Sequence, residues 1–292
     1  MIKLNGKVIE QGRFPDGTLA LNIDSSLIDD LMFEQHITWL YDGDDEMFTI
    51  MSLVDMIKRN GYNRYILYMP YLPNARMDRI KSNNENFALK VFCNWLNSLG
   101  FAKVYVENVH SNVSNALVDN IFDRLPEDDI NFITYIYDFD VIFFPDEGAC
   151  KRYKDMNVIK NLGLPIAFGI KNRDWKTGEI LGLDVVGADV KDKRVLIVDD
   201  ICSKGFTFYF AGQKLRDLGA SDVRLYITHC EDNIQNGRLL DEDVDVISKV
   251  YTTDSICHIE NEKIAFIRIF RDLIWFIKKI LLSLYCKLKI IY

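Results

Sequence analysis

The sequence predicts an α/β fold of two similar domains, each a mainly parallel sheet flanked by helices. Apolar runs of strand length alternate with segments of helical apolar spacing, which is typical of parallel sheets covered by helices. The alternation weakens over a less regular bridge at residues 122–137 and then resumes with a similar rhythm. With 292 residues, the chain can bury two medium-sized cores. We expect an N-terminal domain over 1–136, a C-terminal domain over 137–263 and a terminal segment over 264–292.

In the first half, apolar spacing and helix-stopping residues define the elements. Apolar residues recur at helical intervals in two segments, and each segment is followed by a glycine that can end a helix. A strand-length apolar run follows each helix. The expected elements are a helix over 44–60, a strand over 65–69, a helix over 87–99 and a strand over 104–106.

The second half repeats this order with strands that are almost wholly apolar. Such runs are typical of strands buried on both faces of a parallel sheet. The clearest is Val-Leu-Ile-Val at 195–198. The expected elements are strands over 141–144, 166–170, 195–198 and 223–228, with one helix after the first strand and another over 209–218.

Charge and cysteine usage limit the classes of function. The chain has 43 Asp and Glu against 35 Lys and Arg, a net charge of -8, which argues against a general nucleic-acid binder. Its six cysteines include no Cys-x-x-Cys pair and lie mostly in apolar surroundings, so we expect reduced, buried thiols in a cytoplasmic protein. The first residues turn polar too quickly for a signal peptide.

The segment 264–292 is very apolar, but six lysines and arginines interrupt it. No uncharged run in it approaches the roughly 20 residues that a membrane span requires. Its isoleucines and leucines fall near one helical face from residue 277 onward. We therefore expect a basic amphipathic helix that docks on another domain or subunit, with contact to a membrane surface as the alternative.

The most informative stretch begins where the strand at 195–198 ends. Two adjacent carboxylates, Asp199 and Asp200, come directly after it, at the strand end where open α/β sheets bind ligands. The polar loop 203–207 then offers backbone N–H groups, hydroxyls and a lysine near the start of a helix. This construction suits a phosphorylated sugar, with the acids on ribose hydroxyls or a metal and the loop on the phosphate. A solvated Asp-Asp turn that caps a helix is the alternative.

This stretch resembles the phosphoribosyl diphosphate (PRPP) signature of type I phosphoribosyltransferases and ribose-phosphate diphosphokinases. In that signature Asp-Asp, two variable residues and Asp-Thr-Gly-Gly-Thr follow a strand. Here Ser203, Lys204 and Phe206 replace the third Asp, the first Thr and the second Gly. Phe206 is the most consequential departure, because a glycine permits backbone shapes and a close phosphate approach that a benzyl group restricts. The resemblance implies phosphoribosyltransferase-like domains and ribose 5-phosphate binding by Asp199, Asp200, Ser203, Lys204, Gly205, Phe206 and Thr207.

Two segments of the first half resemble the diphosphokinases, also called PRPP synthetases, in particular. Residues 70–79, Pro-Tyr-Leu-Pro-Asn-Ala-Arg-Met-Asp-Arg, are similar to the family's Pro-Tyr-x-x-x-Ala-Arg-Gln-Asp-Arg. Two guanidinium groups suit a polyphosphate, although such a loop alone is often a surface salt-bridge cluster. Residues 106–111, Val-Glu-Asn-Val-His-Ser, resemble the family's Asp-Leu-His segment, with Asn108 at the position of the acid. The resemblance implies that Arg76, Asp78 and Arg79 bind ATP and that His110 serves catalysis and a metal.

Two loops of the second half extend the resemblance. Residues 144–152, Phe-Pro-Asp-Glu-Gly-Ala-Cys-Lys-Arg, are similar to the family's Pro-Asp-x-Gly-Gly-x-x-Arg loop, which implies a metal-site role for Asp146. The polar loop at 169–179 resembles the family's Lys-x-Arg flexible loop, which implies catalytic roles for Lys171 and Arg173. A plain strand-turn-helix and an exposed charged hairpin are the respective alternatives.

At the N-terminus, residues 14–18 resemble the family's Phe-Ser-Asp-Gly-Glu segment. The resemblance implies that Phe14 and Asp16 contact the adenine of ATP across a subunit contact, and therefore a homo-oligomer. Together these segments run in the family's order from about Phe14 to about Ser255, and this shared order is more specific than any single loop.

The resemblance implies transfer of the diphosphoryl group of ATP to ribose 5-phosphate, which gives PRPP and AMP, with Mg²⁺ near His110 and Asp146. Two competing functions stay open. A type I phosphoribosyltransferase would use the same Asp-Asp loop to bind PRPP. A catalytically weak regulatory subunit would keep the fold while its phosphate loop had changed, as at Ser203 and Phe206.

Overall fold

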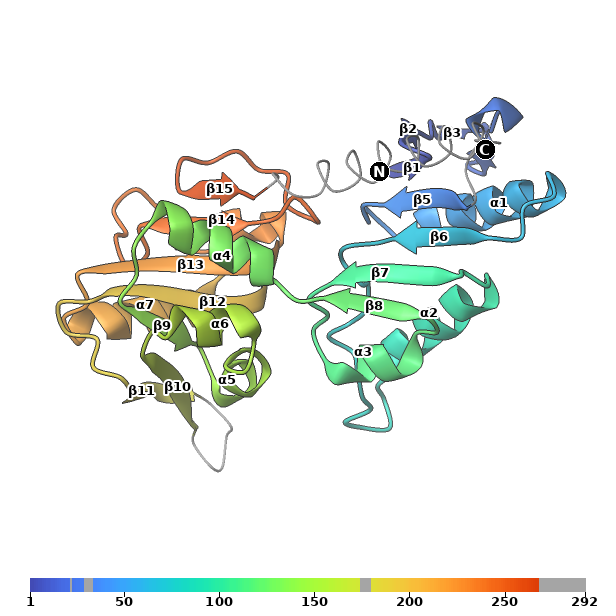
Figure 1. Cartoon of the computed structure of the whole chain (residues 1–292). Helices are drawn as coiled ribbons and strands as arrows, with labels where there is room; N and C mark the ends of the chain where they lie inside the picture. The colour runs from blue at the N-terminus through green and yellow to red at the C-terminus, as the bar shows by residue number, and fades with distance from the viewer. Residues whose placement is uncertain (22, 29–33, 174–179, 268–292) are drawn as a thin grey trace, which may run out of the picture. The chain divides into compact units, whose positions relative to one another are not determined.

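The computed structural model describes residues 1–21, 23–28, 34–173 and 180–267. The chain divides into two compact units, Met1–Pro126 and Glu127–Tyr292. Each unit has its own sheet and helices (Figure 1). The sequence places the domain boundary at 136/137, which is the end of a helix that the structure assigns to the second unit.

The first unit is built on a sheet with strand order β2-β1-β5-β6-β7-β8 within the described residues. The strands from β5 to β8 pair in parallel, while β1 is antiparallel to β2 and β5. A separate hairpin joins β3 to β4. The strands are β1 (Ile2–Leu4), β2 (Lys7–Val8), β3 (Gly12–Arg13), β4 (Leu19–Ala20), β5 (Gln35–Trp39), β6 (Tyr65–Tyr68), β7 (Lys103–Glu107) and β8 (Ile121–Arg124).

The core of the first unit lies between this sheet and two amphipathic helices. Leu53 of the first helix and Phe92 of the second pack in one buried cluster with Trp39 and Leu67 of the strands. Gly61, with φ +85°, follows the first helix, in agreement with the predicted stop. The helices of this unit are α1 (Glu46–Arg59), α2 (Ala88–Ser98), α3 (Asn112–Leu117) and the short 3₁₀ helix η1 (Ser25–Leu27).

The second unit has a larger sheet, with strand order β11-β10-β9-β12-β13-β14-β15 among the described residues. All neighbours pair in parallel except β10 and β11, which form an antiparallel hairpin. Strands β9 and β12 lie at its centre and are almost wholly buried. The strands are β9 (Val141–Phe144), β10 (Ile166–Arg173), β11 (Ile180–Gly187), β12 (Arg194–Cys202), β13 (Asp222–Cys230), β14 (Lys249–Thr252) and β15 (Ile264–Phe266).

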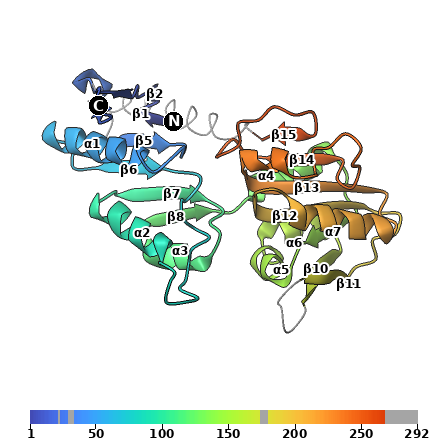
Figure 2. The same cartoon turned by 180° about the vertical axis from the view of Figure 1, so that it is seen from behind.

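Helices cover both faces of the second sheet. Figures 1 and 2 show α4, α5 and α6 on one face and α7 on the other. The side chains of Phe208, Ala211 and Leu215 in α7 pack in the same buried cluster as Ile197 and Leu225. This arrangement confirms the predicted class of fold. The helices are α4 (Glu127–Ile136), α5 (Glu147–Tyr153), α6 (Asn157–Leu162), α7 (Phe206–Asp217) and the 3₁₀ helix η2 (Asp232–Asn236).

The structure corrects several predicted boundaries. The bridge at 122–137 is regular, because it contains most of β8 and all of α4. Strand β12 continues through both acids to Cys202, and β10 continues to Arg173. The helix expected over 264–292 is wrong at its start, because Ile264–Phe266 forms β15 beside β14. Residues 268–292 lie outside the described residues.

Two general expectations can be compared with the described part of the chain. Cys93, Cys150, Cys202, Cys230 and Cys257 are free and buried, as predicted, while Cys286 lies outside the described residues. In the same ranges, every helix is too short or too polar to cross a membrane.

Candidate active site

The two adjacent acids lie at the carboxyl end of β12, in the middle of the second sheet. Asp200 is 6% exposed, Asp199 is partly buried, and the Asp200 backbone N–H donates to Asp199 Oδ1 at 2.9 Å. Burial raises the pKa of Asp199 well above its ordinary value, and the neighbouring charges of Asp200 and Asp146 act in the same direction. Three acidic side chains are therefore crowded here, and a cation or ribose hydroxyls bound beside them would offset that crowding.

Asp146 approaches these acids because its strand, β9, is the direct neighbour of β12. It is the N-cap of α5, and its Oδ1 accepts a hydrogen bond from the Ala149 backbone N–H at 3.0 Å. A Cβ added at Gly148 would lie 3.2 Å from that same oxygen, so a small residue fits this turn best. The strand order and this cap bring Asp146 near Asp199, because the carboxyl ends of neighbouring parallel strands lie at the same edge of the sheet.

The loop 203–207 turns directly into α7. Gly205 has φ +77° and is the N-cap of this helix. A Cβ added there would lie 2.4 Å from Leu239 Cδ1, so both the backbone conformation and the space require glycine. The first N–H groups of a helix have no intrahelical partner and can bind a phosphate.

Phe206 lies where the loop ends and the helix begins. It is the first residue of α7, three residues earlier than the predicted start, and its backbone is helical. Its side chain is 47% exposed. The left-handed conformation that favours glycine belongs to Gly205 and not to residue 206, so the backbone here does not require a second glycine.

Lys171 and Arg173 lie on β10, although the sequence places them in a loop after a shorter strand. Their backbones pair with Leu183 and Ile180 of β11, with an irregularity in the register between Asn172 and Arg173. Residues 174–179, which complete the predicted flexible loop, lie outside the described residues.

In the first unit, Asp78 and Arg79 form a tight pair after β6. Arg79 Nε donates to Asp78 Oδ1 at 2.8 Å, and Nη2 donates to Oδ2 at 3.2 Å. Asp78 is 6% exposed, whereas the Arg79 side chain is 69% exposed. The bond from Arg79 holds the pKa of Asp78 below its ordinary value, and Ser111 and His110 act in the same direction. Asp78 therefore orients the guanidinium, and Arg76 is exposed on the same loop.

His110 is exposed and close enough to Asp78 to influence its charge. The turn before it depends on Asn108, which is fully buried and has φ +46°. Asparagine tolerates this left-handed conformation better than most residues. The Asn108 backbone N–H donates to Arg124 O at 2.9 Å, which ties the turn to β8.

Phe14 and Asp16 lie in the hairpin between β3 and β4. Phe14 is 57% exposed. Asp16 Oδ1 accepts hydrogen bonds from the hydroxyl of Thr18 at 2.7 Å and from its backbone N–H at 3.0 Å, and these bonds lower the pKa of Asp16. The carboxylate therefore shapes its own turn, while the aromatic ring is available for contact.

Each unit thus collects its own set of predicted residues. Asp146, Asp199, Asp200 and the loop 203–207 meet in the second unit, and Asp78, Arg79 and His110 meet in the first. Among the described residues, no three potential ligands are arranged as a metal site. The predicted metal residues His110 and Asp146 belong to different units.

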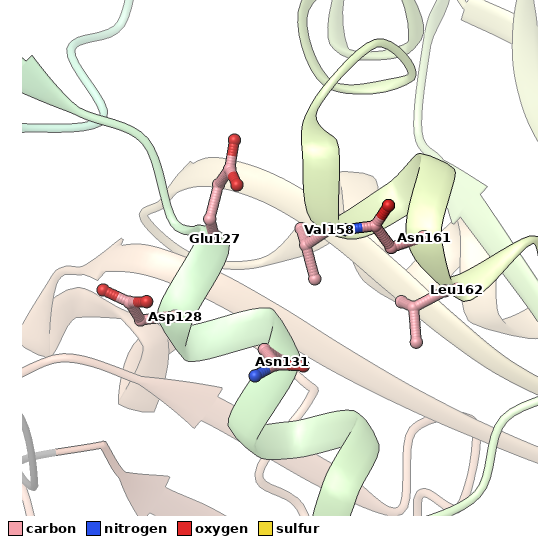
Figure 3. Close-up of a pocket in the computed structure, with 6 residues that line it drawn as sticks. All are labelled: Glu127, Asp128, Asn131, Val158, Asn161 and Leu162. Carbon is pink, nitrogen blue, oxygen red and sulfur yellow. The ribbon is translucent and has the colours of Figure 1, made fainter.

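A pocket elsewhere in the second unit contains none of the predicted residues. It is open to solvent and lies between α4 and α6 (Figure 3). Figure 3 shows acidic, amide and aliphatic side chains around it. Its lining residues are Glu127, Asp128, Asn131, Val158, Asn161 and Leu162.

Sequence reasoning missed the segment 232–239, which packs directly against the loop 203–207. Its glycine, Gly237, follows the two asparagines Asn233 and Asn236. That composition signals only an ordinary turn. The close contact arises between segments about 30 residues apart, so no local pattern indicates it.

Comparison with known proteins agrees with this geometry. The family model for the phosphoribosyl transferase domain matches residues 134–261. Ribose-phosphate pyrophosphokinase of Campylobacter jejuni is 28% identical over 249 residues, which cover 84% of this chain and 78% of that protein. The Pyrococcus furiosus protein of the same name is 30% identical over 231 residues, which cover 76% of this chain and 77% of that protein.

Among solved structures, phosphoribosylpyrophosphate synthetase from Mycobacterium smegmatis has the same fold. The TM-score is 0.72 at 20% sequence identity, over 89% of this chain and 85% of that chain. The strand order and the Asp-Asp loop thus define a protein of the phosphoribosyltransferase-like class with two α/β units. The chain belongs to the ribose-phosphate pyrophosphokinase family.

Proposed function

We propose that this chain is a ribose-phosphate diphosphokinase, which transfers the β,γ-diphosphoryl group of ATP to O1 of ribose 5-phosphate. The products are PRPP and AMP. The observation that carries the proposal is the gathering of Asp146, Asp199 and Asp200 beside a phosphate-binding loop, in a chain of this family.

The second unit would bind the sugar. Asp199 and Asp200 would accept hydrogen bonds from the ribose hydroxyls, because both acids lie only a few residues before the loop 203–207. The 5-phosphate lies on the loop 203–207, where the Ser203 and Thr207 hydroxyls, the Lys204 cation and the first N–H groups of α7 can bind it. Gly205 permits the turn that brings these groups together.

The first unit would bind the nucleotide. Arg76 and Arg79 hold the triphosphate, and Asp78 fixes the Arg79 guanidinium in a bidentate pair. His110 lies beside this pair and contacts the phosphates. Phe14 and Asp16 contribute to the adenine site of a neighbouring subunit, which makes the protein a homo-oligomer.

Lys171 and Arg173 would stabilise the charge that develops as the β-phosphorus is attacked. Transfer of a diphosphoryl group spreads negative charge over several oxygens, and two cations placed there favour the transition state. The attack is direct and in line, so catalysis depends on positioning and charge and requires no covalent enzyme intermediate.

The acidic residues fit Mg²⁺. This ion is usually held by one or two carboxylates together with substrate phosphates, and not by a cage of protein ligands. Asp146 would hold it near the sugar, beside Asp199. Bound Mg²⁺ would neutralise charge on the phosphate oxygens, and its positive charge would offset the crowding of acids at Asp199. The buried thiols favour a cytoplasmic location.

A product assay tests this function. The purified protein is incubated with Mg-ATP and ribose 5-phosphate, and the nucleotides are separated. We expect AMP and PRPP in equal amounts. ADP would indicate an ordinary kinase, and pyrophosphate release from PRPP that depends on an added base would indicate a phosphoribosyltransferase.

A further inference from the structure

Gly237 lies directly against the backbone of the phosphate loop 203–207. A Cβ added at Gly237 would lie 1.8 Å from the carbonyl oxygen of Lys204 and 2.9 Å from its carbonyl carbon. Both atoms belong to the backbone of the loop, so a side chain at 237 could be accommodated only if the loop moved.

A second contact lies one residue further along the loop. Leu239 is 1% exposed, and its side chain fills the space where Gly205 would carry a Cβ. Gly237 therefore lets the two backbones meet, and Gly205 leaves room for the Leu239 side chain. Residues 237 and 239 therefore limit the conformations that residues 204 and 205 can adopt.

The third contact is polar. Asn233 Nδ2 donates a hydrogen bond to Ser203 Oγ at 2.8 Å, and Asn236 Nδ2 donates to Asn233 Oδ1 at 2.9 Å. A serine hydroxyl has one proton to donate and two lone pairs that accept. Because Ser203 Oγ accepts from Asn233, its own proton is directed away from Asn233.

The segment that makes these contacts is anchored to the rest of the unit at both ends. Ile234 is fully buried, and Asp232 Oδ1 accepts a hydrogen bond from the His258 backbone N–H at 2.6 Å. At the other end, Lys263 Nζ donates to the carbonyl oxygen of Leu239 at 3.5 Å and to that of Asp241, two residues further on, at 2.6 Å. The segment can therefore act as a rigid support.

We propose that residues 233–239 form a platform that positions the phosphate loop, and that Asn233 orients the Ser203 hydroxyl to donate its proton to the 5-phosphate of ribose 5-phosphate. The proposal rests on the proposed function, which places the 5-phosphate on this loop. Asn233 and Gly237 are positioning residues, because they act through Ser203 and Lys204 and not by touching the sugar.

Ribose 5-phosphate binding, measured by calorimetry, tests the role of Gly237. Gly237→Ala is expected to weaken binding by about tenfold or more, because the loop must move. Gly182→Ala is the matched control, since no atom lies within 4 Å of its added Cβ. The KM for ATP should change little. Unchanged ribose 5-phosphate binding by Gly237→Ala would overturn the platform.

Asn233→Ala provides an independent test that needs no backbone shift. It is expected to weaken ribose 5-phosphate binding by about tenfold, and Asn161→Ala, on the surface of α6, serves as the control. In a Ser203→Ala background, Asn233→Ala should have no further effect, because both changes remove the same interaction. Additive losses would overturn the role of Asn233.

The same measurements separate this proposal from the proposed function. If the wild-type protein binds ribose 5-phosphate and the variants bind it equally well, only the platform is wrong. If the wild-type protein does not bind ribose 5-phosphate, both proposals fail.

Discussion

At the scale of single residues, the site depends on positions whose backbone conformation or burial is unusual. The sequence places Gly205 in the phosphate loop, and the structure adds that its backbone is left-handed, which glycine adopts at little cost. Asn108 could not be interpreted from the sequence, where it stands only as a departure from the family's acid. The structure explains it by its left-handed backbone. At Phe206 the sequence suggests a loop that binds phosphate poorly. The structure places the ring at the surface.

Lys171 tests the charge-stabilising role directly. Lys171→Ala should lower kcat by about 100-fold or more and change ATP affinity much less, because the lysine acts on charge that develops in the transition state. Lys160→Ala, an exposed lysine paired with Asp155, should leave both parameters unchanged. Steady-state kinetics together with nucleotide binding measure the difference. Equal losses of binding and turnover would assign Lys171 to ground-state binding.

Asp78 tests the support of Arg79. Asp78→Asn keeps the shape of the side chain but removes the charge that holds the guanidinium, so the KM for ATP should rise by about tenfold. Binding of ribose 5-phosphate should not change. Asp55→Asn is a matched control, because its pair with Arg59 is exposed on α1 and contributes little. An unchanged KM for ATP in Asp78→Asn would contradict the orienting role.

Phe206 tests whether the loop is compromised. Phe206→Gly and Phe206→Ala should both bind ribose 5-phosphate within about twofold of the wild-type protein, because the ring lies outward from a helical backbone. Calorimetric titration measures this. Marked tightening in the glycine variant alone would show that residue 206 distorts the loop.

At the scale of elements, the sequence predicts the central strands and the larger helices well, because their apolar spacing is local. The prediction fails where the burial or the length of an element depends on a partner that is distant in the sequence. Helix α4 begins with three acids, and one of them, Asp129, is buried because it accepts a hydrogen bond from Tyr226. The sequence predicts that strand β12 ends at Val198, just before its acids. In the structure, pairing with β13 continues to Cys202. Neither partner is visible in the local sequence.

The ion pair between Arg194 and Asp140, at the starts of β12 and β9, predicts how stability depends on pH. Arg194, the first residue of β12, donates from its backbone N–H and its guanidinium to Asp140, just before β9. These bonds lower the pKa of Asp140 to about 2, below the roughly 3.9 of an unfolded aspartate. The carboxylate therefore stabilises the fold above about pH 4, and this contribution is lost as the pH falls toward 2.

Urea unfolding of the wild-type protein and of Asp140→Asn at several pH values checks this contribution. The wild-type protein should be the more stable at pH 6, and the difference should shrink as the pH falls from 4 toward 2. A difference that stays constant over this range would show that the charge of Asp140 is not responsible.

At the scale of the whole molecule, the alternation of strands and helices predicts two α/β units. Their division lies at Pro126/Glu127 in the structure, because α4 joins the second sheet through Tyr226. The shared order of motifs indicates the same reaction as the family to which the chain belongs. The platform of residues 233–239 cannot be predicted from the sequence, because it contacts residues 203–205 only in the folded chain.

The reaction itself is tested most directly by identifying both products of one incubation. Wild-type protein with Mg-ATP and ribose 5-phosphate should form AMP and PRPP in a one-to-one ratio. The variant Asp199→Asn/Asp200→Asn, folded as shown by its circular dichroism spectrum, should form neither at a comparable rate. Formation of ADP, or no consumption of ATP by folded wild-type protein, would contradict the proposed diphosphoryl transfer.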